Sequence, residues 1–230
     1  MTVINPWILA LPLVRTEEVI GTLVQGFREL AATDVADFQF DLKEPDITKR
    51  LTRHLQTILT ETLVSGFWDF EINQVRKNMT DPRRLDICYS TVEDGTNVRL
   101  IFECKKLYAS TDQRARRHRN GYLNEGVSRF VTGSYAPQDP AAFMVGFVDK
   151  VGRGAVRSLV STLSKGSAVV DLCLREYSAK KYWRAPPALF ADHALFETCH
   201  LRASTFPEIT LYHLELDFPR ASLPKVAKSR

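Results

Sequence analysis

A two-residue turn between two apolar, strand-like runs constrains this chain more than any other feature of its sequence. Asp94–Gly95 separates the run 84–91 from the run 97–107. A type I′ turn needs positive φ at both central residues, which Asp and Gly tolerate, so the pair predicts a tight hairpin. If these two residues form the turn, residues that face each other across the hairpin have numbers that sum to 189.

This turn fixes the face on which each side chain lies, because side chains alternate along a strand. One face carries only apolar pairs: Tyr89 with Leu100, Ile87 with Phe102 and Leu85 with Cys104. The other face carries Cys88 with Ile101, Arg84 with Lys105 and Asp86 with Glu103. The turn therefore predicts that two carboxylates face each other across the hairpin.

Facing carboxylates need a compensating charge. The Cβ atoms of Asp86 and Glu103 would lie roughly 5 Å apart, and like charges in that position destabilise a strand pair. A divalent cation is the simplest compensation, since Mg²⁺ is commonly held by one or two carboxylates together with water and substrate phosphate. Lys105, two residues after Glu103, projects from the same face. The alternative is a solvent-exposed polar face on which Arg84 and Lys105 neutralise the two acids.

Periodicity elsewhere predicts a mixed α/β fold. Glu44 is expected at the N-cap of a helix, because Pro45 suits the first helical position. The apolar run over 141–149 is typical of a strand covered on both faces. We predict helices over 16–31, 44–66, 111–132 and 155–163, and strands over 67–76, 84–91, 97–107, 141–149, 168–176, 193–203 and 209–218. This order gives an antiparallel meander within a mixed sheet flanked by helices.

Length and composition favour one intracellular domain. The chain has 230 residues, of which 44% are hydrophobic and 25% charged, so it can bury a sizeable core. Its four cysteines form no CxxC pair and are typical of reduced thiols rather than of a disulfide framework or a zinc site. The apolar stretch 1–14 is short, holds two prolines and lacks a basic leader. We therefore expect a single cytoplasmic domain over 1–230 with no membrane partner.

Basic residues gather after the hairpin, although the formal net charge is only +4. Their spacing along the helix predicted over 111–132 prevents them from sharing one face, so several should reach phosphates. Such contacts give affinity without sequence choice and weaken steeply with salt. The candidate nucleic-acid contacts are Arg114, Arg116, Arg117, Arg119 and Lys106. The alternative is a solvated helix surface, on a helix that is packed on the sheet by Tyr122, Arg129, Phe130 and Tyr135.

Other catalytic or metal-binding motifs find less support. His193, His200 and His213 lie near Cys199, but no spacing joins them in a recognised metal-binding pattern, and core or surface histidines explain them better. Neither a GxSxG nucleophile motif nor a GxxxxGK[ST] phosphate loop occurs. The sequence therefore argues against a serine hydrolase and against an ATPase.

At the hairpin the chain resembles the PD-(D/E)XK nuclease superfamily, which has the restriction-endonuclease-like fold. The superfamily signature is an acid on one strand and (Asp/Glu)-x-Lys on the next, often preceded by a Glu on the first core helix. Asp86 matches the first acid, Glu-Cys-Lys at 103–105 matches the second element and Glu44 matches the helix acid. Leu85 stands in place of the signature proline, and Asp46 competes with Glu44 as the helix acid.

The resemblance implies an αβββαβ core over 44–149, an N-terminal helical extension over 1–43, and further strands and a helix over 150–230. It also implies a metal-dependent phosphodiesterase, a DNA endonuclease, whose catalytic residues are Asp86, Glu103, Lys105 and Glu44. The resemblance further implies a Mg²⁺ ion, for which Mn²⁺ would substitute. Its ligands would be Asp86, Glu103, the backbone carbonyl of Cys104 and Glu44.

The same resemblance bears on partners. DNA rather than RNA is the expected substrate, and by fold-level analogy a homodimer or a partner protein would complete or target the enzyme. The stretches 121–136 and 143–148 look similar to nuclease-like proteins of bacteria, some of which are associated with defence against phage. The alternative is a non-catalytic nucleic-acid- or protein-binding subunit on the same fold.

Overall fold

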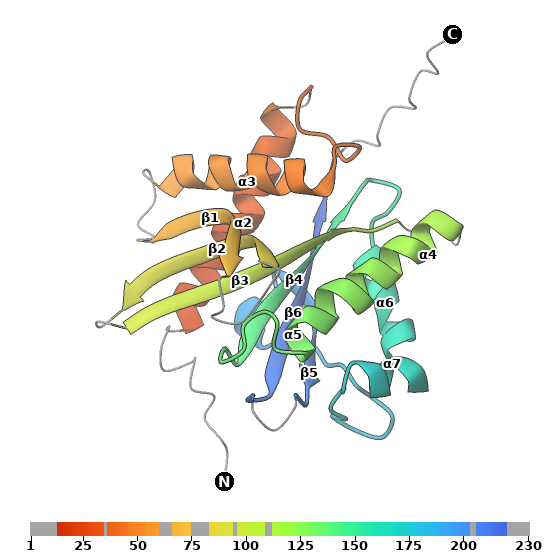
Figure 1. The fold of residues 1–230 in the computed structure, drawn as a ribbon. Helices are drawn as coiled ribbons and strands as arrows, with labels where there is room; N and C mark the ends of the chain where they lie inside the picture. Colours follow the sequence, from red (N-terminus) through yellow and green to blue (C-terminus); the bar gives the residue numbers. More distant parts are fainter. Residues whose placement is uncertain are drawn as a thin grey trace.

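The computed structural model describes residues 13–34, 36–59, 66–74, 83–93, 96–108, 112–202 and 206–219. Within these ranges the chain forms a six-stranded mixed sheet with the order β1-β2-β3-β4-β6-β5, flanked by helices (Figure 1). The strands are β1 (Phe67–Gln74), β2 (Arg83–Glu93), β3 (Thr96–Lys106), β4 (Ala141–Val148), β5 (Ala194–His200) and β6 (Ile209–Asp217). The helices are α2 (Leu13–Thr33), α3 (Glu44–Leu59), α4 (Gln113–Asn120), the π-helix η1 (Gly121–Val127), α5 (Ser128–Val131), α6 (Ala155–Leu163), α7 (Gly166–Asp171) and the short 3₁₀ helix η2 (Ala188–Phe190).

The connection between β3 and β4 brings a helix over the sheet. Strands β1, β2 and β3 form the predicted antiparallel meander. Strand β4 then pairs in parallel with β3, β6 in parallel with β4, and β5 antiparallel with β6. Parallel neighbours need a crossover connection, which the continuous helical segment α4–η1–α5 supplies. The mixed α/β sheet expected from the sequence is confirmed.

Apolar clusters cover both faces of this sheet. Helices α2 and α3 pack on one face, where Phe27 and Leu51 share a cluster with Phe102 of β3. The segment η1–α5 and helix α6 pack on the other face, where the cluster includes Tyr122, Phe130, Leu159, Ile101 and Met144. Strand β4 lies between the two clusters and is buried along its whole length, as its continuous apolar run predicts.

The predicted hairpin register is confirmed over most of its length. Strands β2 and β3 pair from Glu93–Thr96 through Tyr89–Leu100 and Cys88–Ile101 to Ile87–Phe102. The turn residues 94–95 lie outside the described residues.

The register is wrong at the end of the hairpin that carries the acids. Beyond Ile87–Phe102 the ladder pairs predicted for Asp86 and Leu85 do not form in the described strands. Instead the backbone N–H of Cys104 donates to Asp86 Oδ2 at 2.8 Å. Leu85 packs in the cluster on the α6 side of the sheet, away from Ile87 and Tyr89, with which it was expected to share a face. At this end β2 stays paired with β1, at Ile72–Leu85, but no longer with β3, so a register counted from the turn with β3 does not describe Leu85 and Asp86.

The strand predicted over 168–176 is also wrong. Residues Gly166–Asp171 form helix α7, and Leu174 makes an isolated bridge to His200 beside the sheet. A short apolar run does not distinguish a strand from a helix by periodicity alone. Here Val170 is 73% exposed, so the run does not fill an interior strand.

The remaining elements agree with the sequence to within a few residues. Helix α3 begins at Glu44, where the sequence predicted its start, and the predicted continuation over 60–65 lies outside the described residues. The helix predicted over 111–132 spans 113–131, with a central π-helical stretch that the sequence pattern did not indicate. No helix in the described ranges is long and apolar enough to cross a membrane.

The π-helix η1 makes a close approach to the sheet that depends on a glycine. A Cβ atom at Gly126 would lie 2.7 Å from Met144 Cε and 3.6 Å from Glu103 Cγ. Gly121, at the start of the same helix, has no neighbour closer than 4.0 Å to such an atom. Gly126 therefore sets how near η1 lies to Glu103.

This pair of glycines gives a matched test of the packing. We expect Gly121→Ala to raise the free energy of unfolding by about 0.5–1 kcal/mol, because alanine loses less backbone entropy on folding. Gly126→Ala should instead lower it by about 1 kcal/mol, because η1 must move away from Met144. Urea denaturation of both variants measures the difference. An equal gain in both would contradict the close packing of η1 on β3 and β4.

Candidate active site

The predicted catalytic residues Glu44, Asp86, Glu103 and Lys105 meet around one ammonium group. Lys105 Nζ lies 2.8 Å from Glu103 Oε1, 2.9 Å from Glu44 Oε1 and 3.6 Å from Asp86 Oδ2. It also donates to the backbone carbonyl of Cys104 at 2.9 Å. A helix end and two strands thus bring together residues that lie far apart in the sequence.

The backbone of β3 explains why these acids meet here. The N–H groups of Cys104 and Lys106 point to the same side of β3, toward β2, because alternate residues face the same neighbour. Since the ladder with β2 ends at Phe102, side chains take these donors instead. Asp86 Oδ2 accepts from Cys104 N, and Glu44 Oε2 accepts from Lys106 N at 2.9 Å. The carboxylates are therefore structural partners of β3 as well as neighbours of Lys105.

The structure also separates the two candidates for the helix acid. Glu44 and Asp46 both lie in the first turn of α3. Glu44 reaches Lys105 and the backbone of Lys106, whereas the Asp46 side chain is exposed. The geometry therefore favours Glu44.

Glu103 has a strongly raised pKa. Its side chain is fully buried, and burial together with repulsion from Asp86 raises its pKa to about 8, against the pull of Lys105. Burial likewise raises the pKa of Asp86. Burial acts to lower the pKa of Lys105, but the carboxylates outweigh it and raise that pKa, so the lysine stays charged.

Arg129 is a site residue that the sequence did not identify. From α5 its Nη1 donates to Glu103 Oε1 at 2.7 Å and to the Tyr135 hydroxyl at 3.1 Å. Sequence reasoning assigned Arg129 and Tyr135 to helix packing, because nothing in a span of 26 residues links Arg129 to Glu103. The placement of α5 over the end of β3 supplies that link.

The donor set fits a hard divalent cation in its chemistry. All the candidate ligands are oxygen atoms, and Glu103 Oε2 is buried with no hydrogen-bond partner within the described part of the chain. In the same part of the chain, no three His, Cys, Asp or Glu side chains are grouped closely enough to hold a metal ion. Asp86, Glu103 and the Cys104 carbonyl are the oxygens that would hold such an ion, and Glu44 also bonds the backbone of Lys106. Lys105 Nζ contacts Glu44, Glu103 and the Cys104 carbonyl alike.

The predicted nucleic-acid contacts divide into two kinds. Arg114, Arg116 and Arg117 are exposed on α4, and the last two line a shallow surface pocket of about 370 Å³. Arg119 on the same helix is half-buried. The prediction that Lys106 contacts nucleic acid is corrected: Lys106 is buried, and its ammonium group donates to the Leu42 carbonyl at 2.7 Å. Because that group is engaged inside the protein, we leave Lys106 out of the proposed phosphate contacts.

The histidines occupy the core rather than a metal site. His213 Nδ1 bonds the Tyr122 hydroxyl at 3.0 Å, and Thr198 Oγ1 lies within 2.9 Å of ring nitrogens of both His213 and His200. Burial lowers the pKa of His200 to about 4 and also lowers the pKa of His213, so both imidazole rings are neutral near pH 7. His193 pairs with Glu17 on α2. The contacts of His200 and His213 satisfy these two buried rings without a metal, whereas Nδ1 of the half-buried His193 has no hydrogen-bond partner among the described residues.

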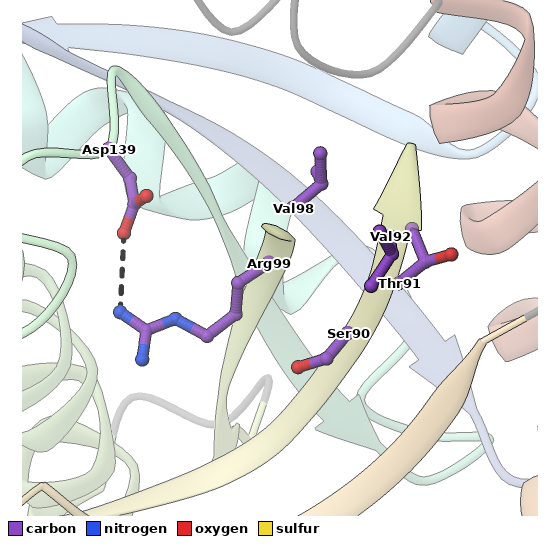
Figure 2. A pocket seen from close by; sticks show the side chains of 6 residues that line it. All are labelled: Ser90, Thr91, Val92, Val98, Arg99 and Asp139. Carbon is purple, nitrogen blue, oxygen red and sulfur yellow. Dashed lines mark ion pairs between the residues drawn. The ribbon is translucent and has the colours of Figure 1, made fainter. Parts of the chain in front are cut away.

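A larger hollow lies away from the acids, near the far end of β2 and β3. Figure 2 shows its lining of Ser90, Thr91, Val92, Val98, Arg99 and Asp139, around a volume of about 420 Å³. The charged pair Arg99–Asp139, at 3.6 Å, is self-neutralising. The hollow contains none of the predicted catalytic residues, so we assign it no part in the chemistry.

The raised pKa of Glu103 predicts how the stability of the metal-free protein depends on pH. The ordinary pKa of 4.5 holds in the unfolded chain and a value of about 8 in the folded one, so the folded state binds the extra proton between them. The contribution of Glu103 to the free energy of unfolding is therefore largest below pH 4.5 and decreases as pH rises toward 8.

Glu103→Gln removes that titration. Relative to wild type, we expect the variant to become more stable by about 1–3 kcal/mol as pH rises from about 5 to about 8 in EDTA. Chemical denaturation of both proteins across this range measures the difference, and a pH-independent difference would show that Glu103 does not carry a raised pKa.

Comparisons with known proteins assign no family to this geometry: no protein-family model, no curated protein and no solved structure matches the chain.

Proposed function

We propose that this chain is a metal-dependent nuclease that hydrolyses phosphodiester bonds, with DNA as its substrate and a restriction-endonuclease-like core. One observation carries the proposal: Glu44, Asp86 and Glu103 all reach Lys105, from a helix end and two strands. Buried acids are costly to a fold, and such perturbed groups cluster at functional sites. The superfamily resemblance gives the same residues roles in phosphodiester hydrolysis.

Each residue of the set has a role that its contacts support. Hydrolysis needs an oriented water, stabilisation of the charge that develops on phosphorus, and help for the leaving oxygen. Asp86, Glu103 and the Cys104 carbonyl would hold a Mg²⁺ ion, which would supply a Lewis acid and lower the pKa of a bound water. Lys105 keeps its charge and places it beside the scissile phosphate.

Two further side chains position the first ones. Glu44 accepts from Lys105 Nζ at 2.9 Å and so directs the ammonium group. Arg129 donates to Glu103 at 2.7 Å and fixes that carboxylate from α5. The exposed Arg114, Arg116 and Arg117 of α4 would hold phosphates of the substrate. Target choice by a partner protein, a homodimeric enzyme and a role in phage defence stay predictions of the sequence.

A non-catalytic binding subunit is the second candidate function. Lys105 lies among the carboxylates and takes up their charge in the way that a cation would. In that case the ion pairs of Lys105 with the three carboxylates would stabilise the fold without hydrolysing nucleic acid. The basic surface of α4 would then serve only to bind nucleic acid. Cleavage distinguishes the two candidates.

We expect metal-dependent nicking or linearisation of supercoiled plasmid DNA in Mg²⁺ or Mn²⁺ and none in EDTA. Asp86→Asn, Glu103→Gln, Lys105→Ala and Glu44→Gln should each lower the rate by on the order of 100-fold or more, because each removes a preorganised charge from the reacting centre. Asp46→Asn is the matched control on α3, and as a change to an exposed side chain it should stay within about twofold of wild type.

Activity that persists unchanged in Asp86→Asn and Lys105→Ala would show that the site is wrong. DNA binding without cleavage by the wild type, under the same metals, would favour the binding subunit instead. Thermal unfolding of each variant separates a lost activity from a lost fold.

A further inference from the structure

Beyond the active site, β3 leads into a row of contacting groups, called the stack below. The Tyr108 ring meets the Phe40 ring edge-on and the His118 ring at a tilt, and the Arg114 cation lies over it. The Tyr108 ring lies 5.0 Å from the Phe40 ring and 4.7 Å from the His118 ring, between centroids. The Arg114 guanidinium lies over the same Tyr108 ring, with Cζ 4.4 Å from its centroid, and Nη2 donates to the Tyr108 hydroxyl at 2.6 Å. Phe40 is buried, Tyr108 and His118 are half-buried and Arg114 is exposed, so the stack runs from the core to the surface.

This stack is joined to the catalytic acids by Lys106. The Lys106 backbone N–H donates to Glu44 Oε2 at 2.9 Å, and its ammonium group lies 4.5 Å from the centroid of the Phe40 ring. The contacts therefore run without a break from the helix acid, through Lys106 and Phe40, to Tyr108 and α4. A ligand seated on the outer end of the stack would be connected to the proposed cleavage site by this series of contacts.

The surroundings of the stack favour an anionic ligand. Burial lowers the pKa of His118, and the positive charges of Arg114 and Lys106 lower it further. Over the ranges that the structure covers, no carboxylate forms an ion pair with Arg114, Arg116 or Arg117. Cations that repel one another at the surface are stabilised by phosphate groups.

A packing role explains only the inner part of this arrangement. Phe40 and the buried part of Tyr108 fill space against the core. The exposed guanidinium adds little buried area, yet it lies over the Tyr108 ring and bonds the hydroxyl of that ring. Planar guanidinium and aromatic groups are the surfaces on which proteins stack bases that are not held in a duplex.

We propose that Tyr108, Arg114 and His118 form a stacking platform for an unpaired base of single-stranded nucleic acid. The inference rests on the proposed function, since it names the form of nucleic acid that enters the site. A base inside a duplex has both faces covered by its neighbours, so only an unpaired one can lie on the guanidinium plane. Arg116 and Arg117 then contact the phosphates on either side.

Binding without cleavage tests the platform. In EDTA, fluorescence anisotropy would compare three labelled probes: a single strand of mixed sequence, the same strand with abasic sugars in its centre, and the duplex. We expect wild type to prefer the intact single strand over both others by about tenfold, in line with the typical worth of base stacking.

Charge-conserving variants separate stacking from phosphate contact. Arg114→Lys should weaken binding of the intact strand by about tenfold and leave the abasic strand unchanged, because lysine keeps the charge and loses the plane. Arg116→Lys is the comparison on α4: because a phosphate contact needs only charge, any loss of binding should be equal for the intact and the abasic strand. His118→Leu should weaken the intact strand as Arg114→Lys does, and thermal unfolding confirms that each variant is folded.

The platform is overturned if Arg114→Lys and Arg116→Lys behave alike, if wild type binds the abasic strand as tightly as the intact one, or if it binds the duplex at least as tightly as the single strand. The proposed function is judged separately, by Mg²⁺-dependent cleavage that Asp86→Asn abolishes. Cleavage with no preference for unpaired bases overturns the platform alone, whereas no binding and no cleavage overturn both.

Discussion

The structure depends on how two backbone N–H groups of β3 are hydrogen-bonded at the point where β2 separates from β3. A strand edge with unpaired donors is costly inside a protein, and here the donors of Cys104 and Lys106 are satisfied by Asp86 and Glu44. One interaction thereby does two things: it completes the edge of β3, and it brings acids from β2 and from the start of α3 to the same point. Lys105 lies between those two donors in the chain, so it is surrounded by the acids that hold its neighbours.

Concentrated negative charge is the second constraint of this region. Glu103 is fully buried, shares one oxygen between Lys105 and Arg129, and leaves the other without a partner in the described part of the chain. Removing a single member of such a buried ionic group leaves the remaining charges unpaired and typically lowers the free energy of unfolding by about 3–5 kcal/mol. Natural sequences tend to break the rules of local consistency at functional sites, which agrees with placing the chemistry here.

The sequence predicted part of this site correctly because the information was local. The turn at 94–95 set the pairing from Glu93–Thr96 to Ile87–Phe102, and the two-residue period put Glu103 and Lys105 on one face. It failed at Leu85 and Asp86, where the strands separate for reasons of tertiary packing that no alternation rule contains. Arg129 was missed because only the crossover helix brings it to Glu103, and the burial of Lys106 depends on the packing of Phe40 and Leu42. Helix α7 was read as a strand because six residues of mixed apolar character carry no decisive period.

The position of β4 has a consequence for where this protein can be divided. Strand β4 is buried throughout and pairs with β3 on one side and with β6 on the other, although β6 comes more than sixty residues later in the chain. A fragment that stopped at residue 149 would turn β4 into an open edge of exposed apolar residues, the kind of edge on which chains aggregate. Although 44–149 includes the acids, Lys105 and Arg129, those residues depend for their framework on the C-terminal strands, so the segment that holds the proposed site is shorter than the segment that must fold.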